Sequence, residues 1–347
     1  MIFIILCSVF AVCSANLGYF LLLRFVWLFR PIRHCAISVK SIIKDHIDIS
    51  GKKKIPEILF FSAFFVDAPA PYLRQITFPI SAMKYIDTHA HLDSFKPLEK
   101  IDELVARARS ASVEKIVVCS TKPDDWLFYE SLASRFRGEV FWQIGIHPED
   151  ISDNCELAFD ALPSFFASDT PPVAIGEIGL DFYRPPSDAD EFEAMKARQS
   201  EIFSRQLELA ESFPEAKICV HARSGVRECI DAIERAGTDF SRVVFHCFSG
   251  SVAELAELNE RGGRASFTGI LTYKSAGEMR ECMLAQGIGR LMFETDCPYL
   301  APVPLRGTVN EPANIPIIAK AAADIFGKNV EYIADAVYEN SRGFFGI

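Results

Sequence analysis

The sequence predicts an α/β fold, a (β/α)8 barrel of the TIM type, preceded by a hydrophobic N-terminal extension. Short apolar runs alternate with amphipathic stretches eight times after residue 83, which is typical of repeated strand–helix units around a parallel sheet. Residues 83–347 number 265, and a closed barrel of this kind takes roughly 250. No Gly-x-Gly-x-x-Gly turn follows the first run, so an open doubly wound sheet is the second choice.

The predicted elements follow from the two periodicities of the pattern. Strands are expected at the apolar runs, which are residues 84–87, 115–119, 140–145, 173–177, 217–221, 243–246, 264–268 and 290–294. The clearest helices are expected between them, over residues 98–111, 189–213, 226–236 and 251–261. In the second of these helices, Phe192, Met195, Ile202, Leu209 and Phe213 mostly recur on one face, as in a helix packed on a sheet.

The charge balance changes near Met83 and divides the chain into residues 1–82 and 83–347. The first segment has 9 basic and 4 acidic residues, and the second has 27 basic and 42 acidic residues. The formal net charge is therefore +5 for residues 1–82 and −15 for residues 83–347, which together give the −10 of the whole chain. Such an acidic balance argues against a protein that coats long DNA by electrostatic attraction.

Residues 1–23 contain no charged side chain and reach the ~20 apolar residues that a membrane-spanning helix needs. Arg24, Arg30 and Arg33 follow, so a span here would leave the remaining chain in the cytoplasm. A cleaved signal peptide is less well supported, because no basic region precedes the apolar run. Two interpretations of residues 1–82 stay open: an anchor that contacts a membrane through residues 1–23, or an extension of the reading frame that the working protein lacks.

The ten cysteines are scattered and form no Cys-x-x-Cys pair, which argues against a zinc ribbon. Several of them lie in short apolar runs, where a thiol packs as a small hydrophobic group. We therefore expect reduced core cysteines in a protein of the cytoplasm or, as a second choice, of the nucleus. A membrane-anchored protein with its catalytic domain in the cytoplasm is the alternative location.

Nearly every predicted strand ends in a side chain that can bind a metal. In a barrel the carboxyl ends of the strands meet at one mouth. All five histidines of residues 83–347 lie at such ends, namely His89, His91, His147, His221 and His246. Glu177 and Asp296 occupy two further ends. Imidazole and carboxylate together suit Zn²⁺, Mn²⁺ or Fe²⁺, and carboxylates also accept Mg²⁺, so these positions predict a metal centre.

The number of ligand-type groups favours two divalent ions. Four histidines and two acids exceed the needs of one tetrahedral ion. They suit two ions roughly 3.5–4 Å apart, joined by a carboxylate and a water. Such a pair lowers the pKa of bound water and can hold both oxygens of an in-line displacement at phosphorus.

In order and spacing, eight short motifs resemble those of the TatD family of metal-dependent deoxyribonucleases, within the wider amidohydrolase-type barrels. The matching stretches are YIDTHAHLD (85–93), GIHP (145–148), GEIGLDFY (176–183), VHAR (220–223), HCFSG (246–250), FTG (267–269), ETDCPYLAP (294–302) and RGTVNEP (306–312). Each motif alone is weak, but eight in series are specific. Together they cover residues 84–312 and leave residues 1–82 without a counterpart.

The resemblance implies roles for the strand-end residues. One ion would be held by His89, His91 and Asp296, and the other by His221 and His246, with Glu177 bridging both. Glu177 and Asp296 would be the catalytic residues, and Asp296 could also accept a proton from the metal-bound water.

Further residues are expected around this centre. The resemblance places His147 near the substrate rather than on a metal. Three basic residues in loops at the strand ends are candidate phosphate contacts, namely Arg223, Lys274 and Arg306. Asp181 and Tyr183 are expected to orient a ligand histidine.

The leading functional hypothesis is a two-metal hydrolase that cleaves DNA, as a 3′–5′ exonuclease on single-stranded or short ends. The alternative is hydrolysis of an ester or amide, such as an aminoacyl-RNA. Glu177 stands where many amidases have a carboxylated lysine, which favours the nuclease. A non-catalytic, membrane-tethered scaffold would be expected to lack metal ligands, and none of the six is missing.

Overall fold

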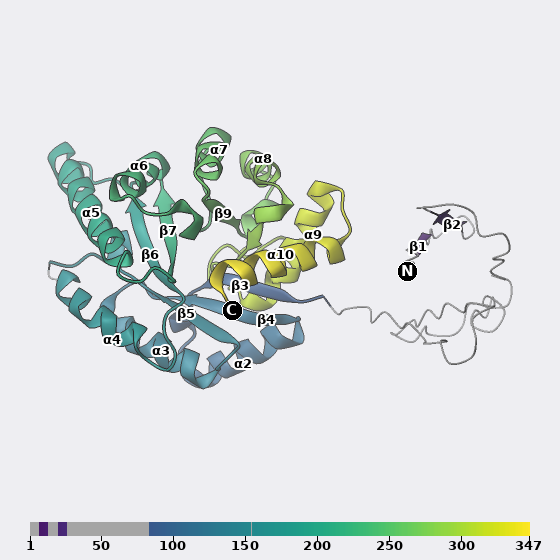
Figure 1. The fold of residues 1–347 in the computed structure, drawn as a ribbon, viewed down its shortest axis with the longest axis horizontal. Coiled ribbons are helices and arrows are strands. Elements are labelled where there is room, and N and C mark those ends of the chain that lie inside the picture. The colour runs from purple at the N-terminus through teal and green to yellow at the C-terminus, as the bar shows by residue number, and fades with distance from the viewer. Residues whose placement is uncertain (1–6, 13–19, 26–82, 154) are drawn as a thin grey trace, which may run out of the picture. The chain divides into compact units, whose positions relative to one another are not determined.

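The computed structural model describes residues 7–12, 20–25, 83–153 and 155–347 (Figure 1). The chain divides into two compact units, Met1–Ser81 and Ala82–Ile347. In the first unit, β1 (Cys7–Val12) pairs with β2 (Phe20–Phe25) in an antiparallel ladder.

One of the two interpretations of residues 1–82 is a membrane anchor within residues 1–23, and the described part of that segment does not form the helix that this interpretation requires. Residues 7–12 lie in β1 and residues 20–23 in β2, so neither stretch is helical. Among the described residues, no helix combines the length and the apolar character that crossing a membrane requires. The remaining residues of the segment, 1–6 and 13–19, lie outside those that the structure describes.

The second unit is the predicted barrel of eight parallel strands. The strands are β3 (Tyr85–Ala90), β4 (Val113–Cys119), β5 (Val140–Ile144), β6 (Ala174–Asp181), β7 (Lys217–Arg223), β8 (Val243–Phe245), β9 (Arg264–Phe267) and β10 (Met292–Phe293). Each strand pairs in parallel with the next one along the chain, from β3 to β10. This order confirms the barrel class and excludes the doubly wound sheet.

The first and last strands meet at a seam made largely by side chains and loop backbone. The amide of Asp296 donates to the carbonyl of His89 at 3.0 Å, and that of His91 donates to Cys297 at 2.8 Å. The buried carboxylate of Asp87 accepts from both the amide and the hydroxyl of Thr295, at 2.9 and 2.5 Å. These bonds hold the two ends of the sheet together and fix the loop that carries Asp296.

Helices surround the strands on the outside of the barrel (Figure 1). They are α2 (Leu98–Ser110), α3 (Trp126–Arg135), α4 (Leu162–Phe166), α5 (Ala189–Ala210), α6 (Val226–Ala236), α7 (Val252–Glu260), α8 (Gly277–Gln286), α9 (Ile315–Phe326) and α10 (Val330–Phe345). In α5, Asp188 caps the first turn, and Ile202, Phe203 and Leu207 form the buried face. Burial of side chains of this size contributes about 1.5–3 kcal/mol each.

The barrel interior is filled near the amino ends of its strands. Val117, Val244 and Met292 from three different strands are buried against Phe344 and Phe345 at the end of α10. The histidines expected to bind metal lie toward the opposite, carboxyl ends of the strands.

Candidate metal centre

Glu177, inside β6, lies at the centre of the polar cluster, and its side chain is only 3% exposed. Its two carboxylate oxygens face different histidines. Oε2 is 3.4 Å from Nε2 of His89 and 3.6 Å from Nε2 of His91. Oε1 is 2.8 Å from Nδ1 of His221 and 2.6 Å from Nε2 of His246. We call these two groups the Oε2 side and the Oε1 side.

The Oε2 side is built from β3 and the loop after β10. Nε2 of His89 and Nε2 of His91 are 3.2 Å apart. Oδ1 of Asp296 lies 3.4 Å from the same nitrogen of His91 and 3.9 Å from that of His89. Asp296 has a left-handed backbone, with φ of 53°, a conformation that non-glycine residues adopt mainly where the surroundings impose it.

The Oε1 side is built from β7 and the end of β8. Nδ1 of His221 is 3.1 Å from Nε2 of His246. The far nitrogen of His221, Nε2, lies 3.0 Å from Oδ2 of Asp181. When Nε2 donates to this carboxylate, Nδ1 keeps a free lone pair directed at Glu177 and His246.

These donors fit divalent cations. Two nitrogen ligands on one tetrahedral ion lie about 3.3 Å apart at ordinary metal–nitrogen lengths, close to both separations found here. Without a cation, facing ring nitrogens at this distance need a proton between their lone pairs. The described residues offer His89, His91, Cys119 and Glu177 as one cluster with donor atoms within 4.8 Å of one another. A second such cluster is His89, His246 and Asp296, and a third is His147, Glu177 and His221.

The contact of Gln143, on β5, with His89 indicates which ring nitrogen of His89 carries the proton. Its side-chain nitrogen lies 3.3 Å from Nδ1 of His89, while its buried Oε1 has no hydrogen-bond partner among the described residues. With the amide turned over, Oε1 would accept from Nδ1–H of His89. The opposite nitrogen, Nε2, would then be free to bind a cation.

Burial and charge together set the ionisation of the cluster. Burial acts to raise the pKa of Glu177, but the charge of His246 and the hydrogen bond to His221 act against it, and that pKa lies well below its usual value. Burial acts to lower the pKa of His91, whereas Asp296 and Glu177 raise it to about 9. Glu177 is therefore ionised, and a bound cation would take the place of the proton on His91.

His147 lies close to the cluster but is poorly suited to bind a metal. Its Nδ1 accepts a hydrogen bond from the amide of Glu149 at 3.1 Å, so the neutral ring carries its proton on Nε2. That nitrogen lies 3.5 Å from Oε1 of Glu177. Burial lowers the pKa of His147 to about 3, which keeps the ring neutral. It is placed to donate from Nε2 into the site.

The three basic residues expected to contact phosphate follow the carboxyl ends of strands. Arg223 ends β7, and its guanidinium lies over the ring of Tyr183 at 3.6 Å. Arg306 lies over Tyr273 at 4.4 Å, and Lys274 is exposed next to that tyrosine.

Asp181 and Tyr183 were both expected to orient a ligand histidine, and the structure places them differently. Asp181 contacts His221, as described above. Tyr183 does not touch a ligand ring through its side chain. Its amide donates to Oδ1 of Asp181 at 2.9 Å, and its ring is 54% exposed beneath Arg223.

Three residues of the site were not predicted from the sequence. Gln143 backs His89, and Glu294 lies 3.5 Å from Nδ1 of His246, held by Ser266 and the amide of Cys247. The third is Cys119, the last residue of β4. All three lie in or at the ends of predicted strands, and a polar residue within an otherwise apolar strand was the available signal.

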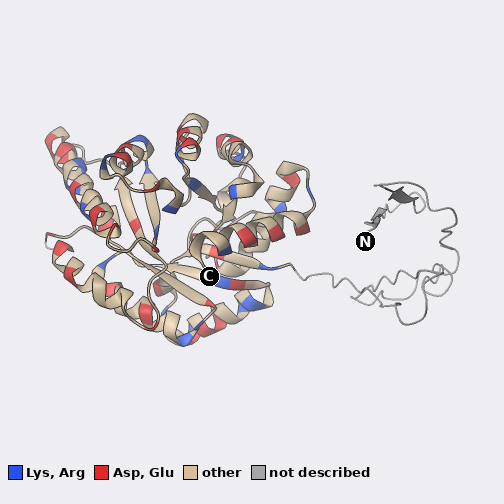
Figure 2. Ribbon diagram, viewed as in Figure 1, with Lys and Arg blue, Asp and Glu red and all other residues tan. Residues whose placement is uncertain are grey.

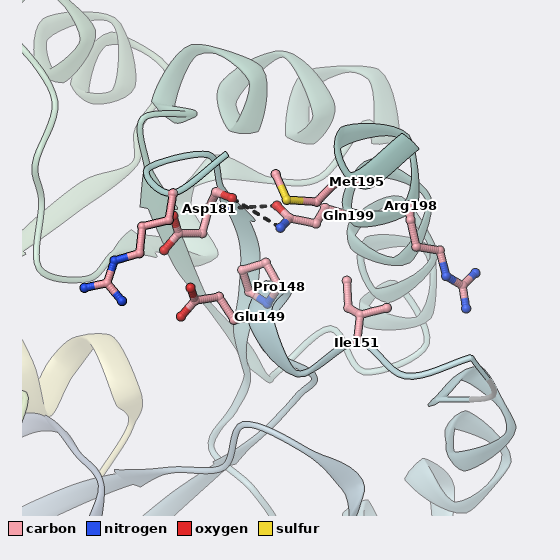
Figure 3. Close-up of a pocket in the computed structure, with 8 residues that line it drawn as sticks. Pro148, Glu149, Ile151, Asp181, Met195, Arg198 and Gln199 are labelled. Atoms are coloured by element: carbon pink, nitrogen blue, oxygen red, sulfur yellow. Dashed lines mark hydrogen bonds between the residues drawn. The ribbon is translucent and has the colours of Figure 1, made fainter. Parts of the chain in front are cut away.

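A pocket of about 350 Å³ lies between the loop after β5 and helix α5 (Figure 3). Its lining includes Pro148, Glu149 and Arg184, with Met195 and Gln199 from α5. Asp181, which contacts His221, also lines it. The side chain of Gln199 pairs with the backbone of Asp181, so α5 holds the wall shared by the pocket and the cluster.

Comparisons with known proteins agree with this architecture. A family model described as TatD related DNase matches residues 86–346. The chain is 31% identical to an uncharacterized metal-dependent hydrolase of Bacillus subtilis, YabD, over 75% of this chain and 98% of that protein. It is 30% identical to the uncharacterized metal-dependent hydrolase YcfH of Escherichia coli, over 76% of this chain and 97% of the relative.

A solved structure supports the same assignment. The fold is similar to the crystal structure of YJJV, a TatD homologue from Escherichia coli, with a TM-score of 0.67 and 25% identity. The likeness covers 76% of this chain and 98% of that one. Since both the family model and the relatives span the whole barrel with its histidine cluster, the chain belongs to the TatD family of metal-dependent hydrolases.

Proposed function

We propose that this protein is a deoxyribonuclease that uses two divalent cations and removes nucleotides from the 3′ end of single-stranded or short DNA. The observation that carries the proposal is the division of the Glu177 carboxylate between two pairs of histidines. A carboxylate that faces two donor sets can join a pair of ions, and two-metal sites of this kind can hold the attacking and leaving oxygens of an in-line displacement at phosphorus.

The Oε2 side, with Asp296, would hold one ion and the Oε1 side the other. Two ions bound there would lower the pKa of a water molecule and offset the charge of the phosphate. Asp296, ionised next to His91, can accept the proton that leaves the attacking water. His147 can donate from Nε2 to a phosphate oxygen or to the leaving group. Arg223, at the end of β7, offers a charged contact to a neighbouring phosphate.

Exposed aromatic rings near the mouth support a single-stranded substrate. Tyr299 is 60% exposed, and its ring lies 6.4 Å from that of His91. Tyr183 is also exposed and lies under Arg223. Unpaired bases stack on such rings, and a guanidinium over the ring adds a contact for the backbone. Bases within a duplex cannot offer their faces in this way.

The acidic balance of the barrel does not oppose this substrate, because many of its acids lie away from the mouth. Figure 2 shows charged residues of both signs on the outer helices. In α5 alone, five acidic residues are exposed, namely Asp190, Glu191, Glu193, Glu201 and Glu208. Such a surface weakens binding of long duplex DNA more than binding of a short end.

The test uses the full chain with single-stranded oligonucleotides labelled at the 5′ end, with Mg²⁺, Mn²⁺ or EDTA. We expect a ladder of products shortened from the 3′ end with metal and none with EDTA. A phosphorothioate linkage at the 3′ terminus should block the ladder, whereas one at the 5′ terminus should not. The matched control is Glu177→Gln, which keeps the size of the side chain and removes its charge.

One outcome would overturn the proposal in favour of the alternative reaction. If the metal-containing protein left all oligonucleotides intact but hydrolysed an aminoacyl ester on RNA, the substrate would be a carbonyl carbon rather than phosphorus. Internal cuts in a circular single strand would instead contradict the 3′–5′ polarity and keep the nuclease.

A further inference from the structure

Cys119 belongs to one of the ligand clusters, although none of the eight family motifs contains it. The residue ends β4, and its side chain is completely buried. Its Sγ lies 3.6 Å from Oε2 of Glu177, on the side of the carboxylate that faces His89 and His91. The sulfur, the two Nε2 atoms and Oε2 all lie within 4.8 Å of one another.

These separations agree with four ligands around one ion. A metal–sulfur length of 2.3 Å and a metal–oxygen length of 2.0 Å in a tetrahedral site put the two atoms about 3.5 Å apart. The observed distance from Sγ to Oε2 is 3.6 Å, and that between the histidine nitrogens is 3.2 Å. The sulfur is thus placed where a fourth ligand would be, beside His89, His91 and Glu177. The carboxylate of Asp296, next to His91, would be a fifth ligand.

We propose that the thiolate of Cys119 binds the cation of the Oε2 side and makes that position prefer Zn²⁺ to Mg²⁺. As the metal–sulfur bond forms, the thiol proton passes to water, so the charges balance. Soft thiolate ligands favour zinc and cobalt, whereas magnesium requires hard oxygen ligands. The Oε1 side has only imidazoles and carboxylates among its described donors and should lack this preference.

Cys219 provides a matched control within the same barrel. It is also buried, but its Sγ lies 3.5 Å from Nδ1 of His89, which is behind the ring as seen from Glu177. A sulfur in that position contacts the outer nitrogen of the ligand and not the ion. The two cysteines therefore share burial and proximity to His89 but differ in their expected access to the metal.

The experiment binds Co²⁺ to the full chain and records its absorption spectrum. Bands in the visible region report occupancy by cobalt, and a sulfur-to-cobalt charge-transfer band in the near ultraviolet reports a thiolate ligand. We expect this band in the wild type and in Cys219→Ser, and its loss in Cys119→Ser and Cys119→Ala. Competition between Zn²⁺ and Mg²⁺, followed by metal analysis, should show that Cys119→Ser weakens zinc binding by at least about tenfold.

Two results would overturn the proposal. One is a wild-type protein that shows the visible cobalt bands but no charge-transfer band. The other is a charge-transfer band that survives in Cys119→Ser and disappears in Cys219→Ser. Circular dichroism of each variant shows whether it is folded, and the two substitutions at position 119 guard against a defect caused by one of them. These readouts need no substrate, so they stand apart from the test for nuclease activity.

Discussion

The two sides of the Glu177 carboxylate use the same kinds of ligand but support them differently. On the Oε2 side, the far nitrogen of His89 faces an amide and a thiol, Gln143 and Cys219. On the Oε1 side, the far nitrogens of both histidines face carboxylates, Asp181 at 3.0 Å and Glu294 at 3.5 Å.

The groups behind His89 and His221 agree with the ionisation of these two rings. Burial lowers the pKa of His89. Burial also acts to lower the pKa of His221, but its bonds to Asp181 and Glu177 raise it. A carboxylate behind an imidazole makes the ring a more basic metal ligand. We therefore expect a cation on the Oε1 side to depend more on the carboxylates behind its histidines, and one on the Oε2 side to depend more on its direct ligands.

The largest expected effect comes from removing the group that both sides share. Glu177→Ala deletes the carboxylate that both sides share and should lower turnover by more than about 1,000-fold, the upper end of the cost of one electrostatic stabiliser. The check is kcat on a labelled oligonucleotide, together with circular dichroism to confirm folding. Activity near the wild-type level in this variant would contradict the assignment of both sides.

Removal of the metal should have the next largest effect, on stability. A ligand at a hundredfold excess over its dissociation constant stabilises the folded state by about 2.7 kcal/mol. For a domain of this size, that corresponds to a rise in Tm on the order of 5–10 °C. Melting with EDTA and after addition of Zn²⁺ or Mn²⁺ measures the shift. Glu177→Ala should show little of it, and an equal shift in that variant would place the bound metal elsewhere.

Asp181→Asn tests the supporting charge on the Oε1 side alone. The substitution keeps the shape of the side chain but removes the carboxylate behind His221, and changes of this kind cost about 10–100-fold in metal affinity or activity. Gln143→Leu is the corresponding change behind His89 and should cost less, because the lost partner is neutral. Metal analysis and kcat check both variants. A larger loss in Gln143→Leu would reverse the comparison.

The barrel and the positions of its ligand histidines could be predicted from the sequence. Alternating apolar runs predicted the barrel, because a parallel sheet buried on both faces needs them. The strand ends then brought His89, His91, His221 and His246 to one mouth, since the chirality and order of such barrels are fixed. A strand was predicted over residues 290–294, but β10 is limited to Met292–Phe293. At the seam, hydrogen bonds from Thr295 to the Asp87 carboxylate stand in place of backbone pairing between strands.

The remaining residues of the site were harder to predict. Gln143, Cys119 and Glu294 belong to the site because each lies within a few ångströms of a residue on another strand. Such distances depend on register and rotamer, which periodicity does not determine. The ring of Tyr183 shows the same limit, since a residue two positions after Asp181 points outward to Arg223.

The smallest expected effect concerns the path of the DNA over the two sides. The guanidinium of Arg223 lies over the ring of Tyr183, and Asp181, two residues earlier, lines the pocket. We therefore expect the bases of the DNA strand to stack on Tyr183, on the Oε1 side. Loss of one stacked base costs about 1–3 kcal/mol, so Tyr183→Ala should raise KM for single-stranded DNA roughly fivefold or more, with kcat little changed. Tyr299→Ala, next to His91, should raise KM less.

Tyr332→Ala on α10 is the matched control, because Tyr332 is as exposed as Tyr183 but follows no barrel strand. If Tyr299→Ala raised KM more than Tyr183→Ala, the DNA strand would instead pass over the Oε2 side.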